Sequence, residues 1–383
     1  METEQENGPP EERQQWKLEK DSELRIEIPE GKGKAEVVLL QGQGEVFGTE
    51  LGSMKPVGDL HVMVTGPVDV GKSTLCKLLL NYAVRSGRRP VFVDLDVGQG
   101  YIGVPGSMGA LLIERPADIE EDKFITNSGF HGISGFPLQA PLVYHYGHTS
   151  PGPNEKLYNK LSSKMAEVTK ERFDKNKKAR VSGCIINTCG WVTGTGYRIV
   201  VHAAEAFEVN VIVVLDQERL YNDLKKQFGS KVQIVHLPKS GGVVVRSQET
   251  RREGRDNRVR DYFYGMNSSF YPHIFEVKFA DIKIFKIGAP AVPDSCLPLG
   301  MAPDQNETKL VPVQPGRDLK HCVLALSAAE SLEEGLVTTN TIGFVVVNDV
   351  DLERQMMVEL SPAPRPLPRK FFLLSDVKFM DFK

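Results

Sequence analysis

The chain has 383 residues, 40% hydrophobic and 25% charged, and its 47 Lys and Arg residues nearly balance 50 Asp and Glu residues. These proportions are typical of a globular protein with room for two or three domains. The net charge of −3 excludes a uniformly basic surface, so a surface for nucleic acid must be a local patch. No apolar run approaches the length of a membrane span, so no membrane partner is expected. Five scattered cysteines indicate reduced thiols inside a cell.

The N-terminal part of the chain reads as strands and turns without a core of its own. Residues 1–15 are polar and are expected to form a disordered tail. From residue 16 to residue 59, short alternating runs are separated by Gly and Pro, which predicts a small β domain. Two or three strands cannot bury a core alone, so this domain must lean on the rest of the protein.

Residues 60–265 alternate between apolar strands and helical patterns. The predicted strands are 60–65, 91–96, 181–187, 209–215 and 231–237, and the predicted helices are 72–85, 154–175, 197–207 and 217–227. Such alternation predicts an α/β domain whose parallel sheet is covered on both faces. Residues 266–383 return to short alternating runs and end in a Pro-rich segment, which predicts a small β-rich C-terminal domain.

The segment GPVDVGKS, residues 66–73, follows the first apolar strand and opens the first helix. It fits the phosphate-loop pattern, in which glycines let backbone N–H groups surround a phosphate at a helix N-terminus. Lys72 supplies a mobile positive charge and Ser73 a hydroxyl for Mg²⁺. The alternative, a Gly-rich turn that arose by chance, does not explain the flanking strand and helix.

Two carboxylates follow the second strand of this domain. Asp94 and Asp96 are two residues apart on a strand and therefore emerge on one face, at the carboxyl edge where open α/β sheets bind ligands. Asp96 is the candidate to hold Mg²⁺ through water or to accept a proton, and Asp94 is expected to shape the site. Gln99, in the next turn, is a candidate to orient a water or the nucleophile. Solvated acids at a strand end are the alternative.

A glycine-rich loop, NTCGWVTGTG, follows the third strand at the same edge. Thr188 lies in its polar turn, and Trp191 is one of only two tryptophans. An exposed indole in such a loop suits stacking on a nucleobase. The alternative is a tryptophan packed under its own loop.

An arginine-rich segment, residues 246–260, precedes the C-terminal domain. Arg251, Arg255 and Arg258 are spaced i, i+4, i+7 and would share one face of a helix. Beside a phosphate loop, such a segment suits a lid that binds transferring phosphate or a nucleic-acid backbone. A solvated charged helix, with Glu253 and Asp256 pairing the arginines, is the alternative.

Together, GPVDVGKST, DLDVGQG, NTCGWV, LPKSGGVVVR, YFYG, DSCLPLG and LSPAPRPLP resemble the RNA 5′-hydroxyl polynucleotide kinases. Within them the likeness is to the Clp-type family, the subunit shared by pre-mRNA cleavage factor II and the tRNA-splicing endonuclease complex. It covers nearly all of residues 16–383. The resemblance implies an N-terminal β-sandwich, a P-loop kinase domain and a C-terminal β domain, and a nuclear location.

The resemblance also implies a reaction, phosphoryl transfer from ATP, with Mg²⁺, to the 5′-hydroxyl of RNA or also DNA. The residues that match its ATP site are Glu23, Asp69, Val70, Gly71, Lys72, Ser73 and Thr74, with Asp96 as the Walker-B acid. Thr188 and Trp191 match a clasp for the acceptor nucleotide. Arg246 and Arg251 match the lid, so the candidate catalytic residues are Lys72, Asp96 and these two arginines. The implied partners are RNA 5′-hydroxyl ends, tRNA-splicing endonuclease subunits and the partner subunit of cleavage factor II.

The sequence departs from this family in two places. A short segment, GSMKPVGD, stands where the family has most of its N-terminal sandwich, and residues 122–138 are an insertion. A shortened sandwich is expected to lower stability and affinity for ATP. A second hypothesis therefore stands beside the kinase: an ATP-bound scaffold subunit of RNA-processing complexes that does little or no catalysis.

Overall fold

The computed structural model describes residues 60–116, 141–265, 270–288 and 307–380, single residues at 17 and 268, and the backbone of a two-stranded hairpin near the N-terminus. The hairpin pairs β1 (Glu45–Val46) with β2 (Thr49–Glu50) and belongs to a unit that ends at Pro56. The remaining residues, Val57–Lys383, form a second compact unit. Within the described residues no helix is long and apolar enough to cross a membrane.

The first part of the second unit is a sheet of seven strands in the order β6-β5-β4-β7-β3-β8-β9. The five strands from β4 to β9 in this order run parallel, whereas β5 is antiparallel to β4 and to β6. The strands are β3 (His61–Thr65), β4 (Val91–Asp94), β5 (Ser107–Leu112), β6 (Leu142–His145), β7 (Cys184–Asn187), β8 (Val211–Leu215) and β9 (Gln233–Leu237).

The α/β fold class is confirmed, and the expected parallel strands are part of a mixed sheet. β5 and β6 form an antiparallel extension that the helix–strand alternation did not reveal, because no helix separates β4 from β5. The strand expected over 181–187 begins only at Cys184, since a short helix, α3 (Lys177–Ser182), occupies the preceding residues. The expected helix over 72–85 is confirmed as α1 (Lys72–Arg85).

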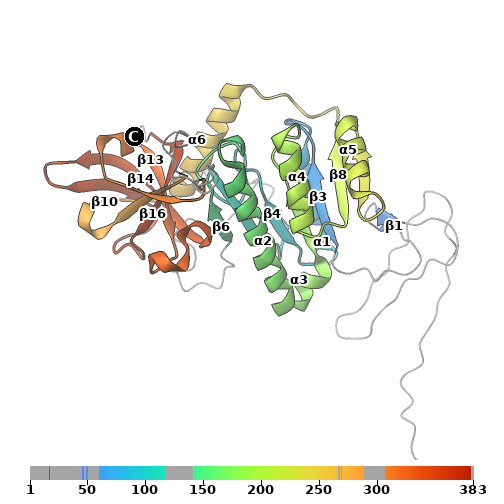
Figure 1. The fold of residues 1–383 in the computed structure, drawn as a ribbon, viewed down its shortest axis with the longest axis horizontal. Helices are drawn as coiled ribbons and strands as arrows, with labels where there is room; N and C mark the ends of the chain where they lie inside the picture. Colours follow the sequence, from blue (N-terminus) through green and yellow to red (C-terminus); the bar gives the residue numbers. More distant parts are fainter. Residues whose placement is uncertain are drawn as a thin grey trace, which may run out of the picture. The chain divides into compact units, whose positions relative to one another are not determined.

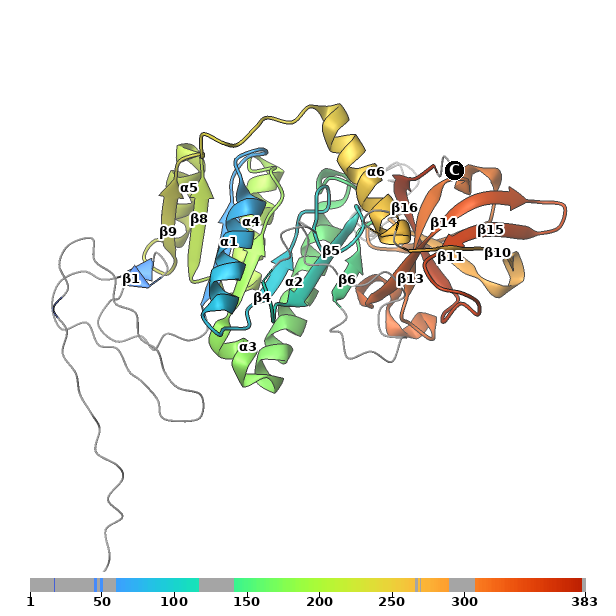
Figure 2. The same ribbon diagram turned by 180° about the vertical axis from the view of Figure 1, so that it is seen from behind.

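Helices cover both faces of this sheet. Figures 1 and 2 show α2 (Glu155–Lys175) and α4 (Thr195–Ala206) on one face and α1 on the other. The N-terminal end of α2 is capped by the Asn154 side chain, which accepts a hydrogen bond from the Leu157 N–H at 2.9 Å. The two remaining helices are α5 (Glu218–Phe228) and α6 (Gln248–Tyr264).

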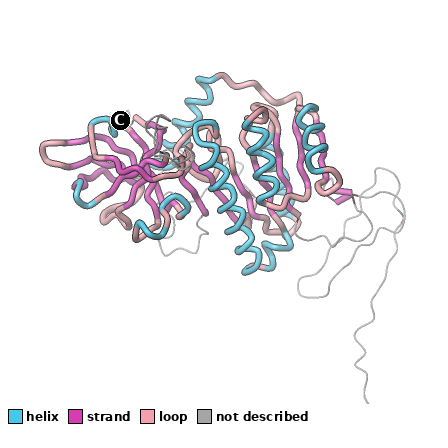
Figure 3. The backbone as a smooth tube through the Cα atoms, viewed as in Figure 1, coloured by secondary structure: helices cyan, strands magenta, loops and turns pink. Residues whose placement is uncertain are grey.

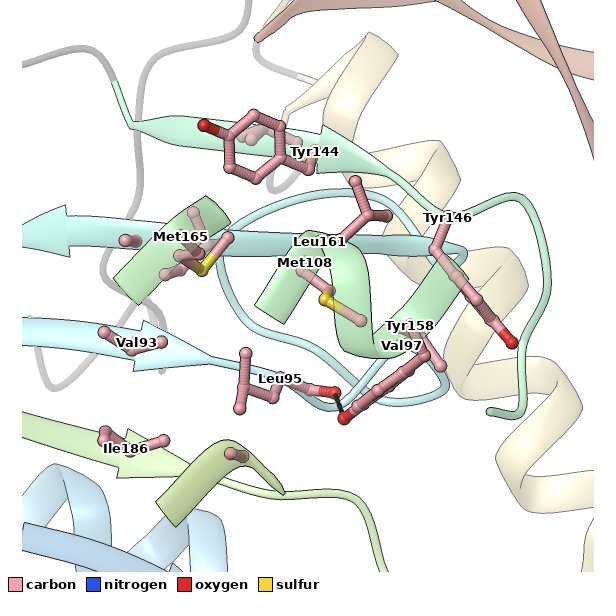
Figure 4. Close-up of a cluster of buried hydrophobic side chains, with 14 of the residues drawn as sticks. Val93, Leu95, Val97, Met108, Tyr144, Tyr146, Tyr158, Leu161, Met165 and Ile186 are labelled. Carbon is pink, nitrogen blue, oxygen red and sulfur yellow. Dashed lines mark hydrogen bonds between the residues drawn. The ribbon is translucent and has the colours of Figure 1, made fainter. Parts of the chain in front are cut away.

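One part of the main hydrophobic core lies between α2 and the strands next to it. Figure 4 shows Tyr158 and Met165 of α2 packed against Leu95, after β4, and Met108 of β5. The buried Tyr158 hydroxyl donates a hydrogen bond to the Leu95 carbonyl at 2.7 Å, so its polar group is satisfied. This packing fixes the backbone just before Asp96.

The C-terminal part is a second sheet of seven strands, in the order β10-β15-β14-β13-β16-β11-β12, and Figure 3 shows that strands dominate it. The strands are β10 (His273–Lys278), β11 (Lys283–Ile287), β12 (Leu310–Val313), β13 (Cys322–Ser327), β14 (Thr341–Asp351), β15 (Met356–Ser361) and β16 (Phe371–Lys378). The β-rich C-terminal domain is thus confirmed.

The central strands of this second sheet are buried on both faces, because their residues alternate between two cores. In β13, Val323 and Ala325 belong to the core shared with the α/β part, whereas Leu324 and Leu326 belong to a separate core of the C-terminal sheet. Neighbouring residues of a strand point to opposite faces, so one strand serves both cores. The two sheets are joined in one hydrophobic body.

Candidate active site

The phosphate loop lies between β3 and α1, at the carboxyl edge of the parallel strands. Gly66 has a φ of 150°, and a Cβ there would come 2.6 Å from the Leu215 carbonyl oxygen, so a side chain is excluded. Gly71 precedes the helix with a φ of 93°. These positions need glycine for backbone conformation or close approach, as expected for a loop that wraps its N–H groups around a phosphate.

Lys72 is the first residue of α1, and its side chain is buried. Its Nζ donates hydrogen bonds to the carbonyl oxygens of Gly66, at 3.0 Å, and Pro67, at 2.7 Å. Burial lowers the pKa of the Lys72 ammonium, against the opposing charge of Asp96. The ammonium is therefore held at the phosphate loop. Ser73 is partly buried and Thr74 is exposed in the same first turn, while Val70 is buried beneath the loop.

The two carboxylates at the end of β4 have different surroundings: Asp94 is the last residue of the strand, which ends two residues earlier than the expected 91–96, and Asp96 lies in the turn beyond it. Asp94 is buried and accepts hydrogen bonds from the Tyr101 N–H at 2.6 Å and from Asn187 Nδ2 at 3.0 Å. Burial, and then the charge of Asp96, raise the pKa of Asp94 to about 7. Asp96 is partly buried, and its Oδ1 accepts from the Gly98 N–H at 3.0 Å and the Gln99 N–H at 3.1 Å. Both of these hydrogen bonds use Oδ1, which leaves Oδ2 for another partner.

The arginines at the start of the expected lid reach the phosphate loop. Arg246 donates to Asp69 from its backbone N–H and from Nε, both at 3.0 Å, and Arg251 donates from Nη2 at 2.5 Å. Gln99 Nε2 donates to the Arg251 carbonyl oxygen at 3.2 Å, and Arg246 Nη1 lies 3.5 Å from Gln99 Oε1. The structure thus brings Asp69, Gln99 and both arginines together.

Helix α6 carries the rest of the arginine face. The Arg258 guanidinium lies 5.0 Å from the centre of the Tyr101 ring, and Lys77 of α1 lies at the same distance from that ring. Tyr101 therefore links α1, the turn after β4 and α6. Its position after the glycine turn was the only sequence signal for this role, which the sequence analysis missed. The expectation of a helix with arginines on one face is confirmed by the span of α6.

The two expected acceptor residues lie in the loop after β7. The Thr188 hydroxyl is buried and donates to the Val64 carbonyl oxygen at 3.0 Å, so it ties this loop to β3. A Cβ on Gly190 would come 2.4 Å from Val68, which shows how closely the loop approaches the phosphate loop. Trp191 is partly buried, with its ring carbons 3.6 Å from where a Cβ of Gly152 would lie. The indole therefore packs against the turn before α2 and is partly exposed to solvent.

Glu23, the candidate contact for the nucleotide base, lies outside the described residues, as does the insertion at 122–138. Among the residues that the structure does describe, no group of three His, Cys, Asp or Glu side chains could hold a metal ion. Mg²⁺ is commonly held by one or two protein oxygens together with substrate phosphates. The Ser73 hydroxyl and the Asp96 carboxylate at one sheet edge fit that mode of binding.

These features define the class of the protein. Parallel strands, a phosphate loop that opens a helix after β3 and an acid just beyond β4, which lies two strands away from β3, are the parts of a P-loop nucleotide-binding domain. Comparison with known families agrees. Residues 66–265 match the P-loop family of the mRNA cleavage and polyadenylation factor CLP1. Residues 270–381 match the pre-mRNA cleavage complex II protein Clp1, and residues 17–58 match the N-terminal β-sandwich domain of polyadenylation factor.

Curated relatives match along almost the whole chain. A protein CLP1 homolog of Nematostella vectensis is 63% identical over 442 aligned positions, which cover 100% of both chains. The polyribonucleotide 5′-hydroxyl-kinases Clp1 of Gallus gallus and Homo sapiens are each 51% identical, over 96% of this chain and 97% of theirs. The chain belongs to the Clp1 family.

A solved structure supports the fold. The Clp1p chain in a complex of Clp1p with Pcf11p superposes with a TM-score of 0.71 at 24% identity, over 84% of this chain and 75% of that one. A second solved structure of that pair, with the same TM-score and coverage, is described as showing the basis for ATP loss in a point mutant.

Proposed function

We propose that this protein is an ATP-dependent polynucleotide kinase that phosphorylates the 5′-hydroxyl ends of RNA. The names of the curated relatives at 51% identity support this activity. The observation that carries it is the convergence of Lys72, Asp96 and two lid arginines at one edge of the sheet. A lysine, an acid and arginines around a phosphate loop are what phosphoryl transfer requires.

The geometry assigns a task to each group. The loop N–H groups and Lys72 would bind the β- and γ-phosphates of ATP, and Ser73 and Asp96 would hold Mg²⁺, which neutralises charge on the phosphates. The substrate 5′-oxygen forms a bond to the γ-phosphorus as the bond from that phosphorus to the β,γ-bridging oxygen breaks, leaving ADP. The proton of the 5′-hydroxyl passes to Asp96 Oδ2. Arg246 and Arg251 stabilise the charge on the transferring phosphoryl group.

The acceptor side is proposed to lie along the loop after β7. Trp191 would stack on the terminal base with the part of its ring that faces solvent, and Gln99 would orient the attacking hydroxyl. Thr188 would act by holding the loop, because its hydroxyl is bonded to the Val64 carbonyl. DNA ends are a further class of acceptor to compare.

The setting of this activity is proposed from the family. The names of the matching families place their members in mRNA cleavage and polyadenylation, and one solved relative is bound to Pcf11p. We therefore expect a Pcf11-type subunit of cleavage factor II and tRNA-splicing endonuclease subunits as partners, in the nucleus.

The second candidate is an ATP-bound scaffold without catalysis. The alignment with the sea anemone relative runs over 442 positions, more than the 383 residues of this chain, so that relative contains segments that this chain lacks. Loss of sandwich residues would weaken ATP binding. The intact phosphate loop, acid and arginines favour the kinase.

Transfer of labelled γ-phosphate to a 5′-hydroxyl oligoribonucleotide tests the proposal, with a 5′-phosphorylated oligoribonucleotide as the matched negative. We expect label only on the 5′-hydroxyl substrate, and loss of transfer in Lys72→Ala with an unchanged circular dichroism spectrum, because Lys72 serves the phosphates. Lys226→Ala, on an exposed turn of α5, is the control and should transfer normally.

The two candidates predict different results. Wild-type protein that binds ATP but labels no 5′-hydroxyl end would support the scaffold. Kinase activity retained in a folded Lys72→Ala protein would contradict the proposed mechanism.

A further inference from the structure

The Asp69 carboxylate joins the phosphate loop to the start of α6 and to the residue Arg246 just before that helix. It accepts three hydrogen bonds, all from Arg246 and Arg251, and its side chain is only 3% exposed. Asp69 also has a positive φ of 55°, a conformation that Asp and Asn tolerate better than most residues. The loop thus has a carboxylate that faces two arginines at a position with a left-handed backbone.

A carboxylate in a phosphate loop is unfavourable by itself, because it repels the phosphates that the loop N–H groups bind. Here the two guanidinium groups offset its charge. Burial acts to raise the pKa of Asp69, but the hydrogen bonds from Arg246 and Arg251 outweigh it and hold the pKa below its ordinary value. The carboxylate therefore stays ionised at neutral pH, and the three groups together carry one net positive charge.

The arginines keep donors for a second partner. A guanidinium has five N–H groups in a planar fork. Arg251 uses one nitrogen, Nη2, on Asp69, and Arg246 uses Nε on Asp69 and Nη1 toward Gln99. Each arginine can therefore bind Asp69 and a phosphate oxygen at the same time, so the lid need not release Asp69 to act.

The start of α6 depends on these polar contacts. The buried residues of this helix are Val259, Phe263 and Tyr264, all in its last six residues. The preceding turns, from Gln248 onward, have no buried side chain and are exposed or half-exposed. Hydrophobic packing therefore anchors the C-terminal end of α6, and Asp69 together with Gln99 holds the end that carries the lid arginines.

We propose that Asp69 is a positioning residue for phosphoryl transfer, which holds Arg246 and Arg251 over the phosphate loop ready to bind the transferring phosphoryl group. This role rests on the proposed kinase function. It differs from the role of the surrounding loop residues, because the Asp69 carboxylate acts on the arginines and its own oxygens do not contact phosphate. Its effect should appear in kcat, since the arginines serve mainly the transition state.

The test compares Asp69→Asn with wild type. Asn retains the left-handed backbone and the side-chain shape but loses the charge. Removing a preorganised donor from a transition state lowers kcat about 100- to 1,000-fold, and we expect a loss of at least about tenfold from misplacing two. The Kd for ATP, measured with a fluorescent ATP analogue, should change less than threefold. Asp256→Asn, on the exposed side of α6, is the matched control and should leave both values unchanged.

Two further measurements separate positioning from a general structural effect. In the Arg246→Ala, Arg251→Ala double variant, adding Asp69→Asn should lower kcat no further. Amide hydrogen exchange over residues 248–254 should be faster in Asp69→Asn than in wild type, with residues 259–264 unchanged. This readout needs no catalysis, so it tests the contact even if wild-type protein transfers no phosphate and the kinase proposal fails.

Asp69→Gly is the second variant, because glycine suits the positive φ and the loop will fold. It should lose kcat as Asp69→Asn does. Wild-type kcat in both variants, or exchange over residues 248–254 equal to that of wild type, would overturn the proposal. A loss of kcat that persists in full in the double-arginine background would also overturn it.

Discussion

Two carboxylates at one strand end show how surroundings divide the work between identical side chains. Asp94 is fully enclosed and organises the turn through Tyr101 and Asn187, whereas Asp96 keeps one oxygen for a partner. Burial raises the pKa of Asp94, and of the two carboxylates only Asp96 is accessible to a ligand. That difference in accessibility suits Asp96 as the acid that accepts a proton beside a bound triphosphate.

At the same scale, Trp191 combines packing with an expected role in acceptor binding. Trp191→Ala should raise the KM for the oligoribonucleotide about ten- to a hundredfold, the equivalent of roughly 1–3 kcal/mol of base stacking. The Kd for ATP should change little. Trp191→Phe, which keeps an aromatic face and part of the packing against Gly152, should restore most of the acceptor affinity. Equal losses in ATP and acceptor binding would identify Trp191 as a packing residue.

At the scale of single elements, β15 contains a buried charge-bearing group away from the candidate site. Glu359 is 0% exposed, and neither of its carboxyl oxygens has a hydrogen-bond partner within the described structure. Burial raises the pKa of Glu359 to about 8, although Arg365 acts in the opposite direction. Glu359 is paired across the sheet with Phe275 of the neighbouring strand β10, so its carboxyl group lies among apolar side chains.

This burial predicts a pH dependence of stability. Glu359 keeps its proton up to about pH 8 in the folded state, whereas in the unfolded chain it loses the proton above its ordinary pKa of 4.5. The folded state therefore holds more protons between about pH 5 and pH 8, and its stability falls as pH rises through this window, by up to about 1.4 kcal/mol per unit. Glu359→Leu should remove this slope.

Urea unfolding of wild type and Glu359→Leu at pH 5.5 and pH 8 measures the effect. The difference in free energy of unfolding should favour the variant more at pH 8. Glu353→Leu, an exposed site in the turn before β15, is the control and should not change the slope. The same pH slope in wild type and Glu359→Leu would contradict the assignment.

At the scale of the second compact unit, α6 ties the candidate site to the C-terminal sheet. Tyr262 packs edge-on against Phe344 of β14, and its hydroxyl accepts a hydrogen bond from the Phe344 N–H at 3.1 Å. Phe263 is buried and lies parallel to Phe379 at 6.4 Å between ring centres. The helix that carries the lid arginines at one end is therefore part of the shared core at the other.

Phe263→Ala should accordingly destabilise the α/β part and the C-terminal sheet together. Removal of a buried phenyl ring costs about 3–5 kcal/mol. We expect a single unfolding transition at lower urea concentration, with tryptophan fluorescence and circular dichroism coincident. Tyr271→Ala removes an aromatic ring that is almost wholly exposed and serves as the control. Two separate transitions in Phe263→Ala would show that the two sheets unfold independently.

The sequence by itself determined the local elements and most chemical groups of the candidate site. The helix 72–85 was predicted to the residue because glycines precede it and its apolar period is regular. The phosphate loop, Asp96 and the arginine helix were all visible as patterns, since each depends on residues close together in the chain. The C-terminal β domain was predicted from its short runs of alternating apolar and polar residues.

The tertiary structure decided what depends on distant partners. The antiparallel strands β5 and β6 were missed because they lack a helical connection. The role of Asp69 could not be predicted, because its partners lie 177 and 182 residues away in the chain. A local sequence pattern depends only on residues that are close together in the chain. The hydrogen bonds to Asp69, the contacts of Tyr101 and the burial of Glu359 arise only when folding brings distant segments into contact.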